Sequence, residues 1–173
     1  VKKAAAYSSM FSLLDIVNAA CTGQIEGMDL DVRGIPHKGF FAPITDFRSY
    51  YDANMALINI KEAQNLFGEG WPIYTRTNNS CPTHYMDGAD IRNSIVSNGC
   101  LIEGTVENSI IGRGCVIKKG AVIKNSIILA DTLIGQDVHL ENFVVDKHAR
   151  LIREKEIIAP VGNPGYIKRR DTL

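Results

Sequence analysis

The stretch that sets the fold is a pattern that occurs three times: IRNSIV at residues 91–96, VENSII at 106–111 and IKNSII at 123–128. Each copy has an aliphatic residue, a variable residue, Asn, Ser, Ile and a second aliphatic residue. A short repeat of this kind predicts a solenoid, because each copy is one structural unit that stacks on the next.

Aliphatic residues recur through this part of the chain every four to six residues. The rhythm fits neither the 3.6-residue period of an α-helix nor the two-residue alternation of a strand. A hexapeptide period is typical of a parallel β-helix, in which each step is a short strand plus a corner and three steps make one coil. About four coils are expected, each strand pointing one aliphatic side chain inward. The residues predicted to point inward are Ile91, Val96, Ile102, Val106, Ile111, Ile117, Ile123, Ile128, Ile134, Leu140, Val145 and Leu151.

The Asn residues of the repeat are predicted to form a ladder at one corner of the β-helix. Asn93, Asn108 and Asn125 hold the same place in three coils, and Asn142 holds it in a degenerate fourth copy, LENFVV at 140–145. Asn tolerates the left-handed backbone of a tight corner and can hydrogen-bond to neighbouring peptides. The ladder is therefore a structural expectation.

Two cysteines are expected to stack on adjacent coils in the same way. Cys100 and Cys115 each lie two residues before an inward Ile, and none of the four cysteines forms a C-x-x-C pair. The spacing therefore argues against a zinc or redox motif. Because no secretory signal is recognisable, four thiols suit a reducing, cytoplasmic compartment, where corner-filling side chains are favoured over a disulfide.

The repeats do not contain a recognisable arrangement of catalytic residues. A serine nucleophile needs a base within hydrogen-bond reach, and the Asn-Ser copies contain none. His139 and His148 leave a hexapeptide acyltransferase open as an alternative function, although no H-x-x-x-x-H spacing supports a three-His metal site. IGRGCV (111–116) lacks the third glycine of a dinucleotide motif. No catalytic, cofactor-binding or metal-binding residue is predicted in this chain.

The N-terminal half differs in character from the repeats. Residues 1–28 and 47–67 are each predicted to be helical from their apolar spacing. Residues 29–47 suggest short β pieces broken by glycine and proline. Residues 68–90 suggest a linker with a short strand at WPIYT (71–75).

The overall charge excludes some partners. Nineteen basic and nineteen acidic residues cancel, so the chain has no global attraction for nucleic acid or an acidic membrane surface. No apolar run approaches the roughly 18 residues of a membrane span. We therefore expect neither nucleic acid nor a membrane as a partner.

A basic run lies at the C-terminal end, where Lys168, Arg169 and Arg170 follow one another. The ordinary interpretation is a solvated terminus. A phosphate-binding effector site is the alternative, because clustered Arg and Lys suit phosphate.

Four stretches together resemble one family. They are SYYDANMALI (49–58), WPIYT (71–75), NSIVSNGCLIEGTVENSII (93–111) and VVDKHARLI (144–152). They are similar to the C-terminal half of glucose-1-phosphate adenylyltransferase, also called ADP-glucose pyrophosphorylase. The resemblance implies an enzyme of glycogen biosynthesis that joins ATP to glucose 1-phosphate, and a C-terminal left-handed β-helix that serves regulation and subunit assembly.

The resemblance also implies a division of the chain. Residues 1–60 would be the remnant of an α/β nucleotidyltransferase domain, 61–90 a linker and 91–173 a left-handed parallel β-helix, so that the fold is mainly β. The family's glycine-rich nucleotide loop has no counterpart in this sequence. We therefore expect no cofactor in this chain, whereas the whole family enzyme uses Mg²⁺ and ATP.

One departure from the family pattern points to a subtype. Catalytic members carry an aromatic pair, one residue and then Asp-Val-Gly-Thr before the linker helix, and this Asp helps to hold Mg²⁺. Here Phe40, Phe41 and Ala42 are followed by Pro43, which has no oxygen in its side chain, and Asp46 lies three residues further on. The pattern resembles the GlgD-type subunit, a paralogue that regulates its catalytic partner.

This subtype implies particular partners. They are a catalytic adenylyltransferase subunit or further copies of the same chain, commonly in a tetramer, with a sugar phosphate as the candidate effector. A β-helix module of another sugar-phosphate nucleotidyltransferase is the remaining alternative.

Overall fold

The computed structural model describes residues 12–23, 33–68, 70, 72–74 and 79–173; the others lie outside the described residues. The chain forms two compact units, residues 1–38 and 39–173. None of the helices in the described part is long and apolar enough to cross a membrane.

The first unit contains helix α1 (Leu13–Cys21). Ser12 caps it: the Ser12 hydroxyl accepts from the Asp15 N–H, and the Asp15 carboxylate accepts from the Ser12 N–H. This reciprocal pair satisfies two of the N–H groups that a helix start leaves without partners. A helix is confirmed within the predicted range 1–28, but it begins at Leu13 and ends at Cys21, and residues 1–11 and 24–28 lie outside the described residues.

The second unit begins with two helices, α2 (Phe47–Ala56) and α3 (Ile60–Leu66). One helix was predicted over 47–67, and the chain breaks it at Asn59. Asn59 has an extended backbone, and its side chain accepts from the Lys61 N–H at 3.0 Å, which starts a new helix. The β pieces predicted within 29–47 and the strand at WPIYT are absent from the described residues 33–46 and 72–74.

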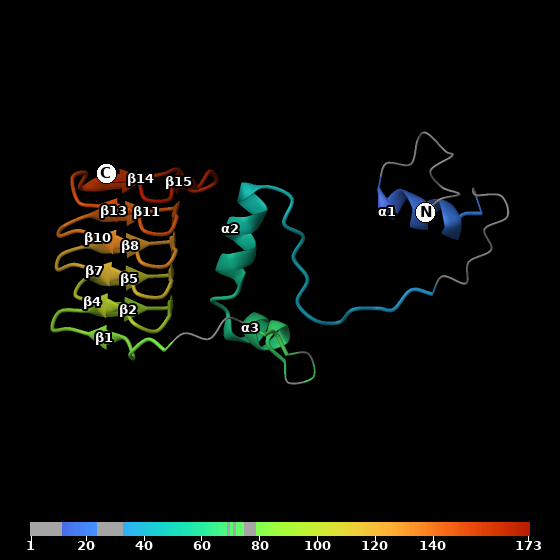
Figure 1. Ribbon diagram of the computed structural model, residues 1–173, viewed down its shortest axis with the longest axis horizontal. Coiled ribbons are helices and arrows are strands. Elements are labelled where there is room, and N and C mark those ends of the chain that lie inside the picture. The colour runs from blue at the N-terminus through green and yellow to red at the C-terminus, as the bar shows by residue number, and fades with distance from the viewer. Residues whose placement is uncertain (1–11, 24–32, 69, 71, 75–78) are drawn as a thin grey trace. The chain divides into compact units, whose positions relative to one another are not determined.

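The rest of the second unit is a parallel β-helix, which confirms the predicted fold (Figure 1). Three consecutive strands form one coil, and each of its three sheets has five strands among the described residues. Sheet A contains β1 (His84–Tyr85), β4 (Leu101–Ile102), β7 (Val116–Ile117), β10 (Leu133–Ile134) and β13 (Arg150–Leu151). Sheet B contains β2 (Asp90–Arg92), β5 (Thr105–Glu107), β8 (Val122–Lys124), β11 (His139–Glu141) and β14 (Glu156–Ile158). Sheet C contains β3 (Ile95–Val96), β6 (Ile110–Ile111), β9 (Ile127–Ile128), β12 (Phe143–Val145) and β15 (Gly165–Ile167).

The register of these strands places each inward aliphatic side chain on the aliphatic side chain of the next coil. In sheet B, Ile91 pairs with Val106, Val106 with Ile123, and Ile123 with Leu140. All the predicted inward residues lie on such ladders, and those from Ile102 to Leu151 are 0% exposed. Each fully buried aliphatic side chain of this size contributes about 1.5–3 kcal/mol to folding. The core is therefore a column of aliphatic residues along the axis of the β-helix.

Sheets B and C differ in the polarity of the residues that point outward. Along sheet B the outward positions include Asp90, Arg92 and Glu107, which are charged. Along sheet C the register aligns only apolar or aromatic outward residues: Ile95, Ile110, Ile127, Val144 and Tyr166. We call this set the outer stripe. Helix α2 contacts β9 on this side, and Ile127 and Val144 are only 1% and 2% exposed.

Candidate functional site

The Asn residues of the repeat form the predicted ladder. Asn93 Nδ2 donates to Asn108 Oδ1 at 3.0 Å, and Asn108 Nδ2 donates to Asn125 Oδ1 at 2.7 Å. Their φ angles are 43°, 45° and 45°, in the left-handed region that Asn tolerates. Asn142 has φ 60° and donates to the Ala159 carbonyl at 2.8 Å instead. These residues turn the chain and tie one coil to the next.

The Ser residues beside them form a second ladder. The Ser109 hydroxyl donates to the Glu107 carbonyl at 2.7 Å and accepts from the Ser126 N–H at 3.0 Å. The Ser126 hydroxyl likewise accepts from the Phe143 N–H at 3.1 Å. Ser109 and Ser126 are 0% exposed, so the hydroxyls supply partners that buried N–H groups need. The Asn-Ser pairs are therefore scaffold, as predicted.

A different corner holds the two predicted cysteines. Cys100 and Cys115 are free and buried, and their thiols contact the carbonyls of Gly112 at 3.0 Å and Leu129 at 3.2 Å. Thr132 takes the same place one coil further on. The adjacent Cys100 thiol and burial raise the pKa of Cys115, so this thiol stays protonated. Both cysteines fill a corner of the β-helix, as predicted.

Helix α2 is attached to the β-helix at three points. The Tyr51 hydroxyl donates to the Asn125 carbonyl at 2.6 Å. The Arg48 guanidinium donates to the Gly162 carbonyl. The Phe47 and Tyr166 rings meet edge to face with centroids 5.8 Å apart, an arrangement that aromatic rings favour. The helix therefore contacts both the third and the last coils.

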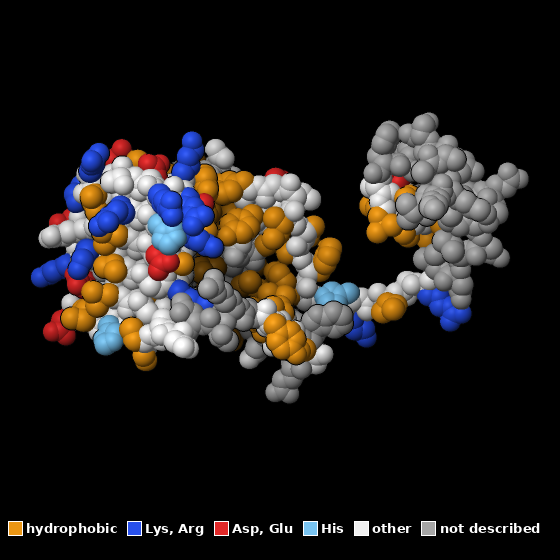
Figure 2. Space-filling model, in the orientation of Figure 1, with side chains coloured by type: hydrophobic (Ala, Val, Ile, Leu, Met, Phe, Trp, Pro, Cys, Tyr) orange, Lys and Arg blue, Asp and Glu red, His pale blue; other side chains and the backbone are white. Residues whose placement is uncertain are grey.

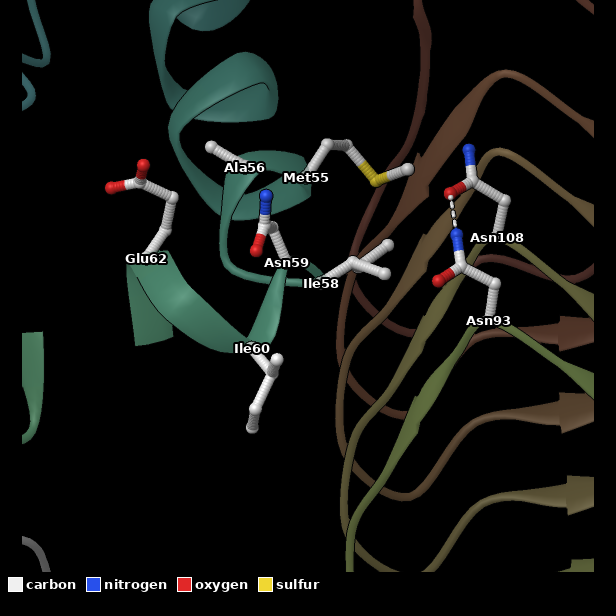
Figure 3. A pocket seen from close by; sticks show the side chains of 8 residues that line it. All are labelled: Met55, Ala56, Ile58, Asn59, Ile60, Glu62, Asn93 and Asn108. Carbon is white, nitrogen blue, oxygen red and sulfur yellow. Dashed lines mark hydrogen bonds between the residues drawn. The ribbon is translucent and has the colours of Figure 1, made fainter. Parts of the chain in front are cut away.

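An open groove of about 720 Å³ lies between these helices and the Asn ladder (Figure 3). Met55 and Ile58 lie on the helix side, and Asn93 and Asn108 lie on the β-helix side. Glu62 carries the only charge among its lining residues. The lining offers amides, apolar surface and a carboxylate, so it does not suit a phosphate.

Positive charge gathers instead at the last coils. Seven Lys or Arg and four Asp or Glu fall between residues 146 and 173. Figure 2 shows Lys and Arg side chains over the upper coils of the visible face. Lys168, Arg169 and Arg170 are exposed, and the Arg170 N–H donates to the Lys147 carbonyl at 3.1 Å. The basic run therefore belongs to the folded β-helix and is not a loose end.

The Asp146 carboxylate interacts electrostatically with this run. Its Oδ1 accepts from the Lys147 N–H at 2.6 Å, and its Oδ2 accepts from the Tyr166 hydroxyl at 2.8 Å. These two hydrogen bonds, with the charges of Arg169 and Lys147, lower the pKa of Asp146. The hydrogen bond to Asp146 raises the pKa of Tyr166. Asp146 is therefore ionised at neutral pH, and Tyr166 keeps its proton.

The histidines considered for acyl transfer lie in different places. His139 is in β11, with Nε2 3.8 Å from Glu141 Oε2. His148 is at a corner with φ 63°, and its Nδ1 lies 3.7 Å from Asp131 Oδ2. Each is thus one half of a separate, partly exposed pair. Within the described residues, no three His, Cys, Asp or Glu side chains come together to hold a metal ion.

Comparisons with known proteins give this fold a context. A family model described as "GlmU-like, C-terminal hexapeptide" matches residues 82–159. The chain is 34% identical over 114 residues to a glucose-1-phosphate adenylyltransferase of Fervidobacterium nodosum, a match that covers 66% of the chain and 28% of the relative. The same named enzyme of Corynebacterium jeikeium is 31% identical over 116 residues, covering 66% and 29%. That of Bacillus mycoides is 28% identical over 128 residues, covering 74% and 34%.

The hexapeptide-repeat part of the chain is thus similar to glucose-1-phosphate adenylyltransferases at 28–34% identity. The chain spans about a third of the length of these adenylyltransferases. The similarity thus concerns only that part of these enzymes.

The Phe41–Asp46 segment was compared above with a stretch that holds Mg²⁺ in adenylyltransferases, and the structure shows whether these residues could bind a metal ion. Pro43 has no side-chain ligand to offer. Asp46 is the N-cap of α2: its Oδ1 accepts from the Ser49 N–H at 2.7 Å, and the Ser49 hydroxyl accepts from the Asp46 N–H at 3.0 Å. The Ser49 N–H and hydroxyl lower the pKa of Asp46. The carboxylate is engaged in capping, so the described residues do not fit a metal ion at this place.

Two features of the site were not predicted from the sequence. One is the outer stripe, whose signal was visible as a second aliphatic residue beside each inward one in NSII. An exposed strand would carry a polar residue there. The other is the pair of Tyr166 and Asp146, which lie twenty positions apart across an irregular last coil and so left no local signal.

Proposed function

We propose that this chain is the C-terminal part of a glucose-1-phosphate adenylyltransferase subunit. That enzyme converts ATP and glucose 1-phosphate to ADP-glucose and pyrophosphate. The observation that supports the proposal is the 28–34% identity of the chain to proteins of that name. The linker helix α2 lies against β9 of the β-helix, on the side of the outer stripe.

Within that enzyme we assign the subunit a regulatory, GlgD-type role. Nucleotidyl transfer needs a metal ion to neutralise the phosphates. Pro43 stands where the catalytic members hold a metal-binding aspartate, and Asp46 caps α2. The subunit would therefore modulate a catalytic partner and contribute little turnover of its own.

The β-helix would supply assembly surfaces for this oligomer, a tetramer with catalytic subunits or with copies of itself. A solenoid leaves its end coils and flat faces without neighbours, so partners commonly cover them. The basic run of Lys168, Arg169 and Arg170 would bind the phosphate of a sugar-phosphate effector, since it is exposed and held by the backbone of the last coil.

The subunit role is tested by co-expressing the intact protein with its catalytic partner and measuring ADP-glucose formation. We expect the protein alone to turn over far more slowly than the mixture. Pro43→Asp serves as the matched variant, because it restores the carboxylate without touching the β-helix. Equal turnover of the protein alone and the mixture would refute the regulatory role.

The effector role is tested with the triple variant Lys168→Ala, Arg169→Ala, Arg170→Ala. We expect it to weaken the response of the mixture to sugar phosphates. The control removes three other cations of the last coil, Arg150, Arg153 and Lys155, which are also exposed. An unchanged response in the first variant, or an equal loss in both, contradicts a specific site at residues 168–170.

A further inference from the structure

We infer that Tyr166 transmits the occupancy of the anion site at the basic run to helix α2, through its contacts with Asp146 and Phe47. The inference rests on the proposed effector role of Lys168–Arg170. It adds to that role the path by which a bound phosphate alters the linker.

The first part of the path is the position of Asp146 against the basic run. The Asp146 N–H donates to the Ile167 carbonyl at 3.0 Å, and the Arg170 N–H donates to the Lys147 carbonyl at 3.1 Å. These two hydrogen bonds hold residues 146–147 beside residues 167–170. Lys147 is exposed like the basic run, so it adds a fourth cation to the same surface.

The second part of the path is the competition between the Asp146 carboxylate and a bound phosphate for the same cations. Without a ligand, the Asp146 carboxylate is the anion that faces Arg169 and Lys147, and their charges help to lower its pKa. A phosphate bound to these cations places a second negative group beside Asp146. Like charges at short range repel, so the bound phosphate disfavours the position of the Asp146 carboxylate.

The third part is the double contact of Tyr166. Its hydroxyl donates to Asp146 Oδ2 at 2.8 Å, and its ring meets Phe47 at the start of α2. When Asp146 is displaced, Tyr166 loses the hydrogen bond that sets its orientation. The edge-to-face contact with Phe47 is then weakened, and the first turn of α2 is held less firmly against the β-helix.

The neighbouring attachments of α2 localise the effect. Tyr51 is bound to the Asn125 carbonyl in the third coil and does not touch the basic run. The first turn of α2, around Phe47 and Arg48, should therefore respond to phosphate more than the turn around Tyr51. Tyr166 acts as a positioning residue between the ligand and the helix.

The test compares phosphate affinity with amide hydrogen exchange in the 173-residue chain. Inorganic phosphate is titrated by calorimetry, and exchange is followed over residues 47–56. In the wild type we expect saturable binding and about a threefold faster exchange at the start of α2, since that segment opens locally. Tyr166→Phe should bind phosphate within about twofold of the wild type and lose the exchange response. The control Tyr51→Phe also deletes one tyrosine hydroxyl, and it should keep the response.

The outcomes separate the inference from the proposed function. If wild type binds phosphate but α2 does not respond, or if Tyr166→Phe responds as the wild type does, the path through Tyr166 is wrong and the effector site stands. If the wild type does not bind phosphate, the effector role is overturned together with this inference. Loss of binding in Arg169→Ala with a retained fold confirms that the response starts at the basic run.

Discussion

Asn108 donates its side-chain amide to Asn125 one coil away at 2.7 Å, while both residues hold the left-handed backbone of their corners at φ 45°. One residue type thus performs two tasks at each turn of the β-helix. The two tasks can be separated by substitution. Glycine adopts the left-handed backbone but has no side-chain amide, whereas alanine disfavours that backbone and also has no amide.

We predict that Asn108→Gly costs about 2 kcal/mol of unfolding free energy, because it removes the side-chain hydrogen bonds to Asn93 and Asn125, each worth about 1 kcal/mol. Asn108→Ala should cost roughly 1–2 kcal/mol more, because a Cβ disfavours left-handed backbone. Urea unfolding of both variants measures the difference. Equal losses would show that the left-handed corner is not a source of strain.

The outer stripe predicts a contrast between two isoleucines at the same place in different coils. Ile127 is 1% exposed beneath α2, whereas Ile95 is 38% exposed. Ile127→Ala should lower the unfolding free energy by about 2–4 kcal/mol, because it leaves a cavity under the helix. Ile95→Ala should cost less than about 1 kcal/mol. Similar losses at both positions would mean that α2 does not cover the stripe in solution.

The cap of α2 predicts a pH effect at its start. The Asp46 pKa is lowered in the folded chain, so its contribution to stability is present above about pH 3.9, the ordinary pKa of Asp. That contribution is lost as the pH falls through the lower, folded pKa. The protection of the α2 amides, measured as exchange relative to the intrinsic rate at each pH, should therefore fall on acidification in the wild type.

Asn serves as the matched replacement for this carboxylate, because it also caps helices but does not titrate. Asp46→Asn should keep α2 protected at neutral pH and remove this part of the acid response. Asp46→Ala should raise exchange at neutral pH already. An acid response in Asp46→Asn as large as in the wild type would assign the effect to another group.

The cysteines predict two classes of thiol. Cys21 and Cys81 are exposed, and Cys100 and Cys115 are buried. A thiol reagent should label the first two rapidly in the folded chain and the other two only after denaturation. Cys115→Thr should fold, because Thr132 fills the same corner one coil on. Rapid labelling of all four thiols would contradict the closed corner.

The sequence predicted the β-helix and its core residue by residue because both depend on local spacing. A strand of two or three residues and a corner are decided within six positions, so Ile102 or Leu140 could be placed inward without any knowledge of distant contacts. The Asn ladder followed from the same register, since the backbone of a tight corner limits which residue can occupy it.

Other features were missed because they depend on contacts between distant parts of the chain. The residues of 47–67 are apolar enough for one helix, yet Asn59 competes with the helix by capping the next turns with its side chain. Asp46 was compared only with the metal-binding aspartate of the family, whereas Ser49 three residues later was the signal of a capping box. The link from Phe47 to Tyr166 joins residues more than a hundred positions apart, and no periodicity reports it.

The attachment of α2 also changes how the β-helix should come apart. In a solenoid each coil contacts only its neighbours, so the end coils can fray one at a time. Helix α2 binds the Asn125 carbonyl in the third coil and the Gly162 carbonyl in the last. The last coil therefore cannot open independently of the helix, and the third to fifth coils are expected to unfold as one cooperative block, while the first coil, outside this span, frays freely.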